Sequence, residues 1–287
     1  DLSVGEGEVF GCLGPNGAGK TTTMRLILGL LRPTGGDALL WGARASESPE
    51  VRRRIGVLLE SDGLYPRLTA YENLDYFARL YGVEVRRRRI EELLEFTGLT
   101  DRARDKIATF SRGMRRKLGL ARALLHSPDL LMLDEPSAGL DPEAQKMVRD
   151  LIVRLSSESR ISVFLSSHDL DEVQRICGRV AILQHGRVRV NDTLKSLQSS
   201  DNESVEITLV DPSRHDEAVH LLKQQDYVRG TTGAAGRISL TLQQGQGVAS
   251  LAAKLETQGM AVEEMRRSRR SLEEVYLDVV RQERDRE

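Results

Sequence analysis

The chain has 287 residues, enough for one large domain or two, with 39% hydrophobic and 30% charged residues and a formal net charge of −1. This composition is typical of a soluble globular protein, and the balanced charge gives no indication of general nucleic-acid binding. No stretch approaches the ~18–20 consecutive apolar residues of a membrane-spanning helix, and no signal peptide is recognisable.

The first predicted elements are a buried strand at 9–13 and a helix at 23–30. The loop between them, residues 14–22 with the sequence GPNGAGKTT, matches the phosphate-binding pattern G-x-x-x-x-G-K followed by Ser or Thr. Glycines let backbone N–H groups point at phosphate oxygens, and the following helix adds its positive N-terminal end. A glycine-rich turn without a ligand is the alternative, but it requires neither the lysine nor the threonine in register.

Within this loop we expect Lys20 to reach the β- and γ-phosphates of a nucleotide and the Thr21 hydroxyl to ligate Mg²⁺. The residues expected to bind the nucleotide here are Asn16, Gly17, Gly19, Lys20, Thr21 and Thr22.

Short strands are predicted at 37–41 and 55–59, and a helix at 69–81 that begins with a capping box of Thr69 and Glu72. The next helix runs from 86 to 96 and opens with four consecutive arginines. Such a basic run is typical of a solvated helix face, with phosphate or lipid-headgroup binding as the alternative.

Continuous apolar strands that alternate with helices indicate an α/β domain with a mostly parallel sheet covered on both faces. Two late strands at 180–183 and 187–190 flank His185-Gly186, which predicts a tight hairpin. The two cysteines, Cys12 and Cys177, lie in apolar runs, and we expect buried free thiols rather than a disulfide or metal site. Further elements are predicted as helices at 111–125 and from Asp141 onward, and as strands at 130–133 and 161–165.

A polar stretch at 196–202 predicts a linker, after which the pattern restarts. The later order strand–helix–strand–strand–helix–strand is that of a small ferredoxin-like α+β domain. We therefore expect a first domain at 1–197, with a helical subdomain at about 64–125, and a second domain at 203–287. The elements of the second domain are predicted at 205–210, 214–224, 227–228, 237–242, 248–258, 260–265 and 271–281.

Two acids, Asp134 and Glu135, end the apolar strand at 130–133. Mg²⁺ prefers one or two carboxylates together with water, so we expect Asp134 to hold the Mg²⁺ hydration shell. Because side chains alternate along a strand, Glu135 points elsewhere and can polarise a water in line with the γ-phosphate. General-base help of this kind is typically worth ~10²–10⁴ in rate. Two acids that only cap a strand before Pro136 are the structural alternative.

A second anion-binding device lies at the start of the helix at 111–125. Ser111 offers a hydroxyl and Gly113 an unobstructed backbone N–H, and the helix terminus adds its dipole. Taken alone, these residues are explained equally well as a plain helix cap.

The chain resembles the nucleotide-binding subunit of ATP-binding-cassette (ABC) transporters. The resemblance rests on the order of its motifs, which is the phosphate loop, Ser111-Arg112-Gly113, Asp134-Glu135, residues 137–141 and His168. The resemblance covers residues 1 to about 195. It implies that ATP and Mg²⁺ are held between two copies of the chain, with Ser111 and Gly113 of one copy closing over the ATP of the other. It also implies that Asp141 belongs to a nucleotide-contacting loop between the two sites, and that His168 contacts the γ-phosphate and holds the attacking water.

Three positions differ from the usual pattern of that family. Residues 111–113 correspond to the signature sequence of that family, and Arg112 stands where this signature usually has glycine. We expect nucleotide binding to survive because Ser111 and Gly113 remain. Glu60 stands where a glutamine usually faces Mg²⁺ and the water, and we count it as a metal ligand beside Thr21 and Asp134. The aromatic residue that stacks on adenine usually lies upstream of the phosphate loop, but residues 1–9 contain none. We expect either that the chain lacks its first strands or that adenine stacking is lost; Trp41 is expected to serve packing instead.

The resemblance further implies ATP hydrolysis that powers export by a separate membrane permease, which docks on the helical insert at 64–109. It places the chain at the cytoplasmic face of the membrane as a homodimer without a nucleic-acid partner. The tail after residue 200 resembles the small C-terminal domain of export-type members.

Three other functions fit the sequence less well. A soluble ABC-type ATPase acting on ribosomes or DNA usually has two cassettes or a long coiled-coil insertion, and neither is visible in this sequence. A non-catalytic module would not need Lys20, Asp134, Glu135 and His168 together. A P-loop kinase needs neither the signature nor His168.

Overall fold

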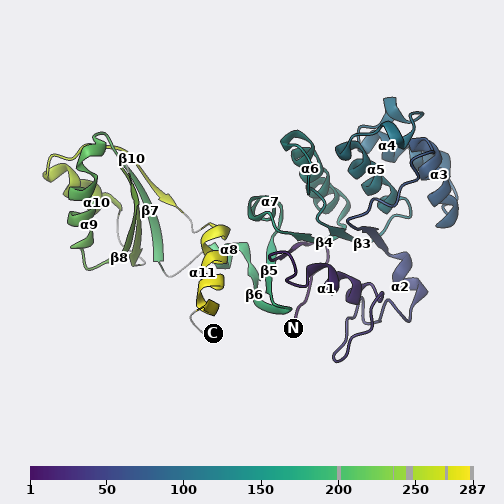
Figure 1. Ribbon diagram of the computed structural model, residues 1–287, viewed down its shortest axis with the longest axis horizontal. Coiled ribbons are helices and arrows are strands. Elements are labelled where there is room, and N and C mark those ends of the chain that lie inside the picture. Colours follow the sequence, from purple (N-terminus) through teal and green to yellow (C-terminus); the bar gives the residue numbers. More distant parts are fainter. Residues whose placement is uncertain (199–201, 235, 244–247, 269–270, 285–287) are drawn as a thin grey trace. The chain divides into compact units, whose positions relative to one another are not determined.

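The structure is a computed structural model, and it describes residues 1–198, 202–234, 236–243, 248–268 and 271–284. The chain forms two compact units, Asp1–Thr193 and Leu194–Glu287. Each unit has its own sheet and its own hydrophobic core (Figure 1). The predicted linker falls in part on residues 199–201, which lie outside the described residues.

A six-stranded sheet in the order β2-β3-β4-β1-β5-β6 forms the centre of the first unit. The pairs from β2 to β5 are parallel, and β6 runs antiparallel to β5. Every residue of β1 and β3 is buried, as expected for strands covered on both faces. The predicted α/β class is therefore confirmed. The strands are β1 (Val9–Leu13), β2 (Ile55–Leu58), β3 (Leu130–Asp134), β4 (Ser162–Ser167), β5 (Arg179–Gln184) and β6 (Arg187–Thr193).

Helices α3, α4 and α5 pack against one another, and α5 also packs on β2. They lie together at one end of the sheet in Figure 1. The predicted capping box of Thr69 and Glu72 opens α3. The helices of this unit are α1 (Lys20–Ile27), α2 (Pro49–Arg53), α3 (Ala70–Leu80), α4 (Arg86–Phe96), α5 (Arg112–Leu124), α6 (Pro142–Ser159) and α7 (Leu170–Ile176), with short turns η1 (Thr100–Arg102) and η2 (Ile107–Thr109).

Some local predictions differ from the structure. The predicted strand at 37–41 is wrong, since Leu40 and Ala43 form a single antiparallel bridge across the turn at Trp41-Gly42 and the pairing extends no further. A bridge across one turn lacks the ladder of partners that makes a strand. Helix α1 begins at Lys20 rather than at residue 23. The short helices α2 and α7 were not predicted, although Ser48 before Pro49 is a recognisable helix start.

The second unit contains a four-stranded sheet in the order β10-β7-β9-β8, with all neighbours antiparallel. This order, with α9 after the first strand and α10 after the third, is ferredoxin-like and confirms the prediction. Alternate residues such as Val205, Ile207 and Leu240 pack against Leu222 of α9 and Leu251 of α10. The elements are α8 (Leu194–Gln198), β7 (Asn202–Leu209), η3 (Pro212–Arg214), α9 (His215–Lys223), β8 (Val228–Ala234), β9 (Arg237–Gln243), α10 (Val248–Thr257), β10 (Val262–Ser268) and α11 (Leu272–Arg284).

Both cysteines are buried free thiols, as predicted. Burial raises the pKa of Cys12 to about 12 and also raises the pKa of Cys177. In the part of the chain that the structure describes, every helix is too short or too polar to cross a bilayer.

Gly56→Ala is expected to destabilise the first unit. A Cβ at Gly56 would lie 2.3 Å from the Ala123 carbonyl oxygen of α5 and 2.7 Å from Leu131 Cδ2, so β2 or α5 must shift. Overpacking of this kind costs about 1–3 kcal/mol, which should lower the urea midpoint followed by circular dichroism. Gly178→Ala is the matched control, because nothing lies within 4 Å of its Cβ. Equal midpoints for both variants would contradict the close packing of α5 on β2.

Candidate active site

The phosphate-binding loop joins the carboxyl end of β1 to α1. Gly19 precedes α1 with a φ of +106°, which residues with a side chain rarely adopt. A Cβ at Gly14 would lie 2.4 Å from the Leu183 carbonyl oxygen of β5, so the loop can fold this tightly only with glycine there. The predicted phosphate ligands Asn16, Gly17 and Thr22 are exposed on this loop.

Lys20 lies at the base of this loop with only 7% of its surface exposed. Its ammonium group donates to the Gly14 carbonyl oxygen at 2.7 Å and pairs with Glu135 Oε1 at 3.3 Å. A buried charge is tolerated only with partners. The structure thus places the predicted phosphate lysine directly against the predicted base.

The side chains of Thr21 and Asp134 meet across the end of the sheet. Thr21 Oγ1 donates to Asp134 Oδ2 at 3.0 Å, and Ser166 Oγ donates to Asp134 Oδ1 at 2.5 Å. Asp134 is 2% exposed, so these two hydroxyls fix the direction of its carboxylate. Oxygen ligands of two of the three predicted metal residues are therefore adjacent.

Glu135 connects the lysine to the histidine. Its Oε2 lies 2.8 Å from His168 Nδ1, while its Oε1 faces Lys20. The backbone of Glu135 has a φ of +48°, and its N–H donates to the carbonyl oxygen and the hydroxyl of Ser166 at 3.2 and 3.1 Å. These bonds hold a conformation that is unfavourable for a residue with a side chain, and strain of this kind often occurs at functional sites.

Ser111, Gly113 and Asp141 form a second cluster, between α5 and α6. Ser111 Oγ accepts from the Met114 N–H at 3.2 Å, and Asp141 Oδ1 accepts from the Ala144 N–H at 2.9 Å. A Cβ at Gly113 would lie 2.9 Å from Ala144 Cβ, which shows how closely the two helix starts approach. Two predicted anion-binding elements thus occupy different parts of one chain.

Glu60, the third predicted metal ligand, is exposed just beyond β2. Among the described residues it forms no hydrogen bond with Thr21 or Asp134. It lines a cavity together with Asp62, Arg112, Arg115, Arg116 and residues 138–140. Its role as a metal ligand stays a prediction.

Sequence analysis missed three polar residues that support the site: Ser166, Arg116 and Glu172. Arg116, on α5, donates to three backbone carbonyl oxygens at the ends of β2 and β3. Glu172 is 2% exposed, and Ser167 Oγ donates to its Oε2 at 2.7 Å. Burial raises the pKa of Glu172, and the hydroxyls of Ser137 and Ser167 oppose that rise. The one feature of the sequence that could have indicated these residues is the polar pair Ser166-Ser167 at the end of an apolar strand.

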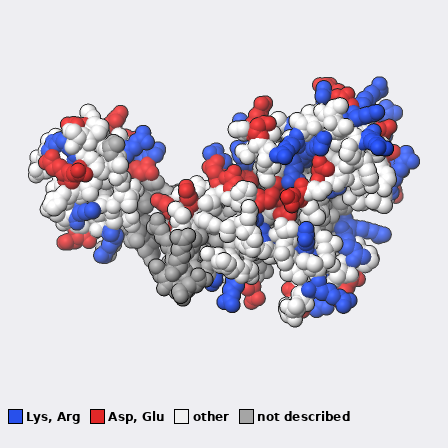
Figure 2. Space-filling model, viewed as in Figure 1, with Lys and Arg blue, Asp and Glu red and all other residues white. Residues whose placement is uncertain are grey.

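The four arginines at the start of α4 do not form a free anion site. Each is engaged by a neighbouring acid: Arg87 by Glu91 at 3.0 Å, and Arg88 by Glu92 at 2.9 Å. Figure 2 shows basic and acidic side chains interspersed over this end of the first unit. The interpretation as a solvated helix face is supported. The other two ion pairs are Arg86 with Asp75 and Arg89 with Glu92.

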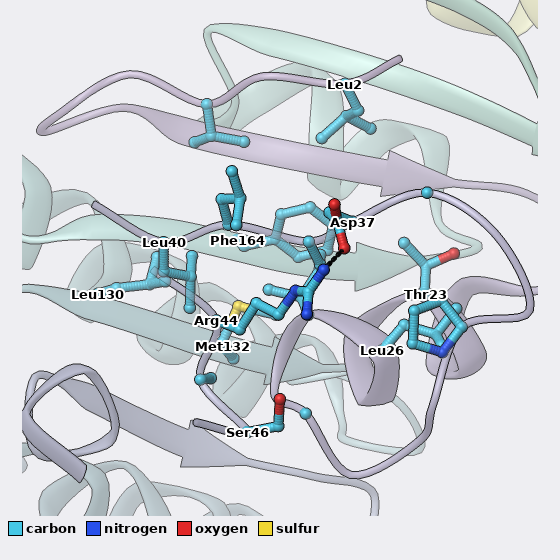
Figure 3. A pocket seen from close by; sticks show the side chains of 18 of the residues that line it. Leu2, Thr23, Leu26, Asp37, Leu40, Arg44, Ser46, Leu130, Met132 and Phe164 are labelled. Atoms are coloured by element: carbon cyan, nitrogen blue, oxygen red, sulfur yellow. Dashed lines mark hydrogen bonds and ion pairs between the residues drawn. The ribbon is translucent and has the colours of Figure 1, made fainter. Parts of the chain in front are cut away.

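A larger cavity of about 1290 Å³ is lined in part by Thr23, Leu26 and Ile27 of α1 (Figure 3). Its walls are mostly apolar and include Leu26 of α1, Met132 of β3 and Phe164 of β4, with the ion pair of Asp37 and Arg44 at its mouth. None of the predicted site residues lines it. Trp41 borders this cavity with the Arg54 guanidinium 3.8 Å from its ring centre, in line with the predicted packing role.

Comparison with known proteins agrees with this geometry. The family model "ABC transporter" matches residues 1–138. The uncharacterized ABC transporter ATP-binding protein YhcH of Bacillus subtilis (strain 168) is 40% identical over 97% of this chain and 90% of its own length. The fluoroquinolones export ATP-binding protein Rv2688c of Mycobacterium tuberculosis (strain ATCC 25618 / H37Rv) is 42% identical over 69% of this chain and 65% of its own length.

A solved structure is similar to about two thirds of the chain. It is the dimeric ATP-binding cassette MJ0796 in a post-hydrolysis state bound to ADP and Pi. It matches with a TM-score of 0.61 and 27% identity over 67% of this chain and 88% of its own. The chain therefore belongs to the ATP-binding proteins of ABC transporters, a family of ATPases.

Proposed function

We propose that this chain binds ATP with Mg²⁺, hydrolyses ATP at a site completed by a second copy, and thereby drives export through a separate membrane permease. The observation that carries the hydrolytic part is the chain of contacts Thr21–Asp134 and Lys20–Glu135–His168 at one edge of the sheet. These contacts support the proposal, because a γ-phosphate bound beside Lys20 would lie near the hydroxyl and carboxylate ligands, the proposed base and the histidine.

The residues at this edge fit Mg²⁺ with a nucleotide. Thr21 Oγ1 and Asp134 Oδ2 are hard oxygen ligands 3.0 Å apart, the kind that Mg²⁺ takes together with water and phosphate. When bound, Mg²⁺ would neutralise charge that develops on the phosphate oxygens. Glu60 is proposed as a further oxygen ligand for the ion or for its water.

Lys20 and Glu135 are proposed to exchange partners when ATP binds. Phosphate oxygens offer Lys20 a stronger anion than its present ion pair at 3.3 Å. Glu135 would then be released to accept a proton from the attacking water at one carboxylate oxygen, while His168 Nδ1 holds the other oxygen. When both of its ring nitrogens carry a proton, His168 would also donate to a γ-phosphate oxygen through Nε2.

The second cluster is proposed to close over the nucleotide of another copy. Ser111 and Gly113 lie at a helix N-terminus, which favours anions, and their described contacts belong to α5 and α6 rather than to the phosphate loop of their own chain. Asp141 is proposed to lie at the same junction. The dimeric state of the solved cassette supports this arrangement.

Export and a membrane permease are proposed from the relatives. Rv2688c is named as a fluoroquinolones export ATP-binding protein, and the match to YhcH spans both units of this chain. A permease at the membrane would place the chain at the cytoplasmic face, with α3 and α4 as the docking helices.

Glu135→Gln is expected to slow ATP turnover at least ~10²-fold while ATP binding persists, because the amide cannot take up the proton of the attacking water. Phosphate release and binding of a fluorescent ATP analogue measure the two effects. Glu143→Gln, an exposed acid in the first turn of α6, is the control. Near-normal hydrolysis by Glu135→Gln would remove Glu135 from the role of base.

Ser111→Arg is expected to abolish ATP-dependent dimerisation without affecting ATP binding by the monomer. The long side chain would block the helix start that meets the nucleotide of the other copy. Size-exclusion chromatography with light scattering, in the Glu135→Gln background with ATP, measures the dimer. Ser157→Arg, at an exposed position of α6, is the control. A Glu135→Gln protein that stays monomeric with ATP would contradict the shared site.

A permease partner is tested by purification of the full chain from membranes in mild detergent. A multi-span membrane protein in stoichiometric amount is the expected result. Recovery of the chain with ribosomes or DNA instead would overturn the proposed coupling to export and leave the ATPase site intact.

A further inference from the structure

The Arg116 side chain joins the helix of Ser111 to both strand ends of the active site. Arg116 is 8% exposed. Its Nη1 donates to the Leu59 carbonyl oxygen at 2.7 Å, and its Nη2 donates to the Glu135 carbonyl oxygen at 2.9 Å. A longer contact of 3.4 Å reaches the Asp134 carbonyl oxygen. One planar guanidinium thus binds the backbone of Leu59, which precedes Glu60, and the backbone of Glu135, the proposed base.

Arg116 is also a buried cation surrounded by acids. Burial lowers its pKa, and the charges of Asp62, Asp134, Glu60 and Glu135 oppose this effect. The described ion pairs do not include Arg116, so these carboxylates act on it through space while its N–H groups are directed to carbonyl oxygens. A guanidinium keeps its proton even under such burial.

The amount of negative charge at this site makes the cation significant. Glu60 is an exposed carboxylate that lines the same cavity as Arg116, and ATP would add further negative charge. Arg116 itself is buried, and a buried charge is screened much less than a charge on the surface. A fixed cation at this cavity should therefore matter for hydrolysis.

We propose that Arg116 is a positioning residue that fixes the backbone of Glu135 and offsets the charge of Glu60, so that a glutamate can serve at that position. This inference rests on the proposed ATPase site. Because Arg116 lies on the helix that Ser111 caps, it also connects that helix directly to the backbone of Leu59 and of Glu135. A purely structural role, in which Arg116 only ties α5 to the sheet, would not depend on the charge at residue 60.

A double-mutant cycle separates the two roles. Arg116→Gln is expected to lower kcat at least ~10-fold with less than ~3-fold change in the KM for MgATP, since phosphate binding by Lys20 is untouched. In the Glu60→Gln background the same substitution should cost at least ~3-fold less in kcat, because residues in one charge network couple. An equal loss of kcat in both backgrounds would overturn the inference.

The control cycle uses Arg88→Gln and Glu92→Gln, an exposed arginine–glutamate pair at 2.9 Å on α4. It should show no coupling in kcat. Arg116→Lys keeps the charge but lacks the planar fork, so it should recover part of the kcat lost in Arg116→Gln. If Arg116→Gln fails to fold by circular dichroism, the cycle is run with Arg116→Met, which is also neutral, and equal losses again overturn the inference. A wild-type chain without ATPase activity would instead overturn the proposed function.

Discussion

The parallel pairing of β4 with both β1 and β3 is the constraint on which the site depends. Leu13 is in register with Ser167, and Asp134 with Ser166. Because parallel strands present their carboxyl ends at one edge, the phosphate loop, the two acids and His168 meet there although they are far apart in the sequence. A shift of one residue in either pairing would turn alternate side chains to the opposite face and separate Asp134 from Thr21.

The balance of charge then determines which partners the charged side chains at this edge have. Lys20 and Arg116 are buried cations; Lys20 pairs with the carboxylate of Glu135, whereas Arg116 donates to the backbone carbonyl oxygens of Asp134 and Glu135. Glu135 is the proposed base, and a bound phosphate would compete with it for Lys20. Among the described residues, Arg116 donates to backbone oxygens alone, so it can hold the backbone of Glu135 whether or not Lys20 changes partner. The strain at Glu135, about 1–3 kcal/mol for a residue with positive φ, is held by bonds from Ser166 and Arg116.

Two anion-binding elements in one chain explain why a single copy would be half a site. The loop before α1 and the cap of α5 are each helix N-termini, and each has its own local partners. The second unit has a separate hydrophobic core. We propose that hydrolysis resides in the first unit, which contains the phosphate loop, Asp134 and Glu135.

The local features could be predicted from the sequence, since they depend on neighbouring residues. They include the phosphate loop, the caps at Thr69, Ser111 and Asp141 and the hairpin at His185-Gly186. The fold class of both units could be predicted as well, because it follows from the order of strands and helices. The strand predicted from the short apolar run at 37–41 is wrong, because a strand also needs a partner strand and the sequence does not show one. Ser166, Arg116 and Glu172 could be recognised only in the tertiary structure, because their partners are a carboxylate, backbone oxygens and a hydroxyl that the fold brings close. No spacing along the chain encodes a contact between a helix arginine and two carbonyl oxygens 57 and 19 residues away.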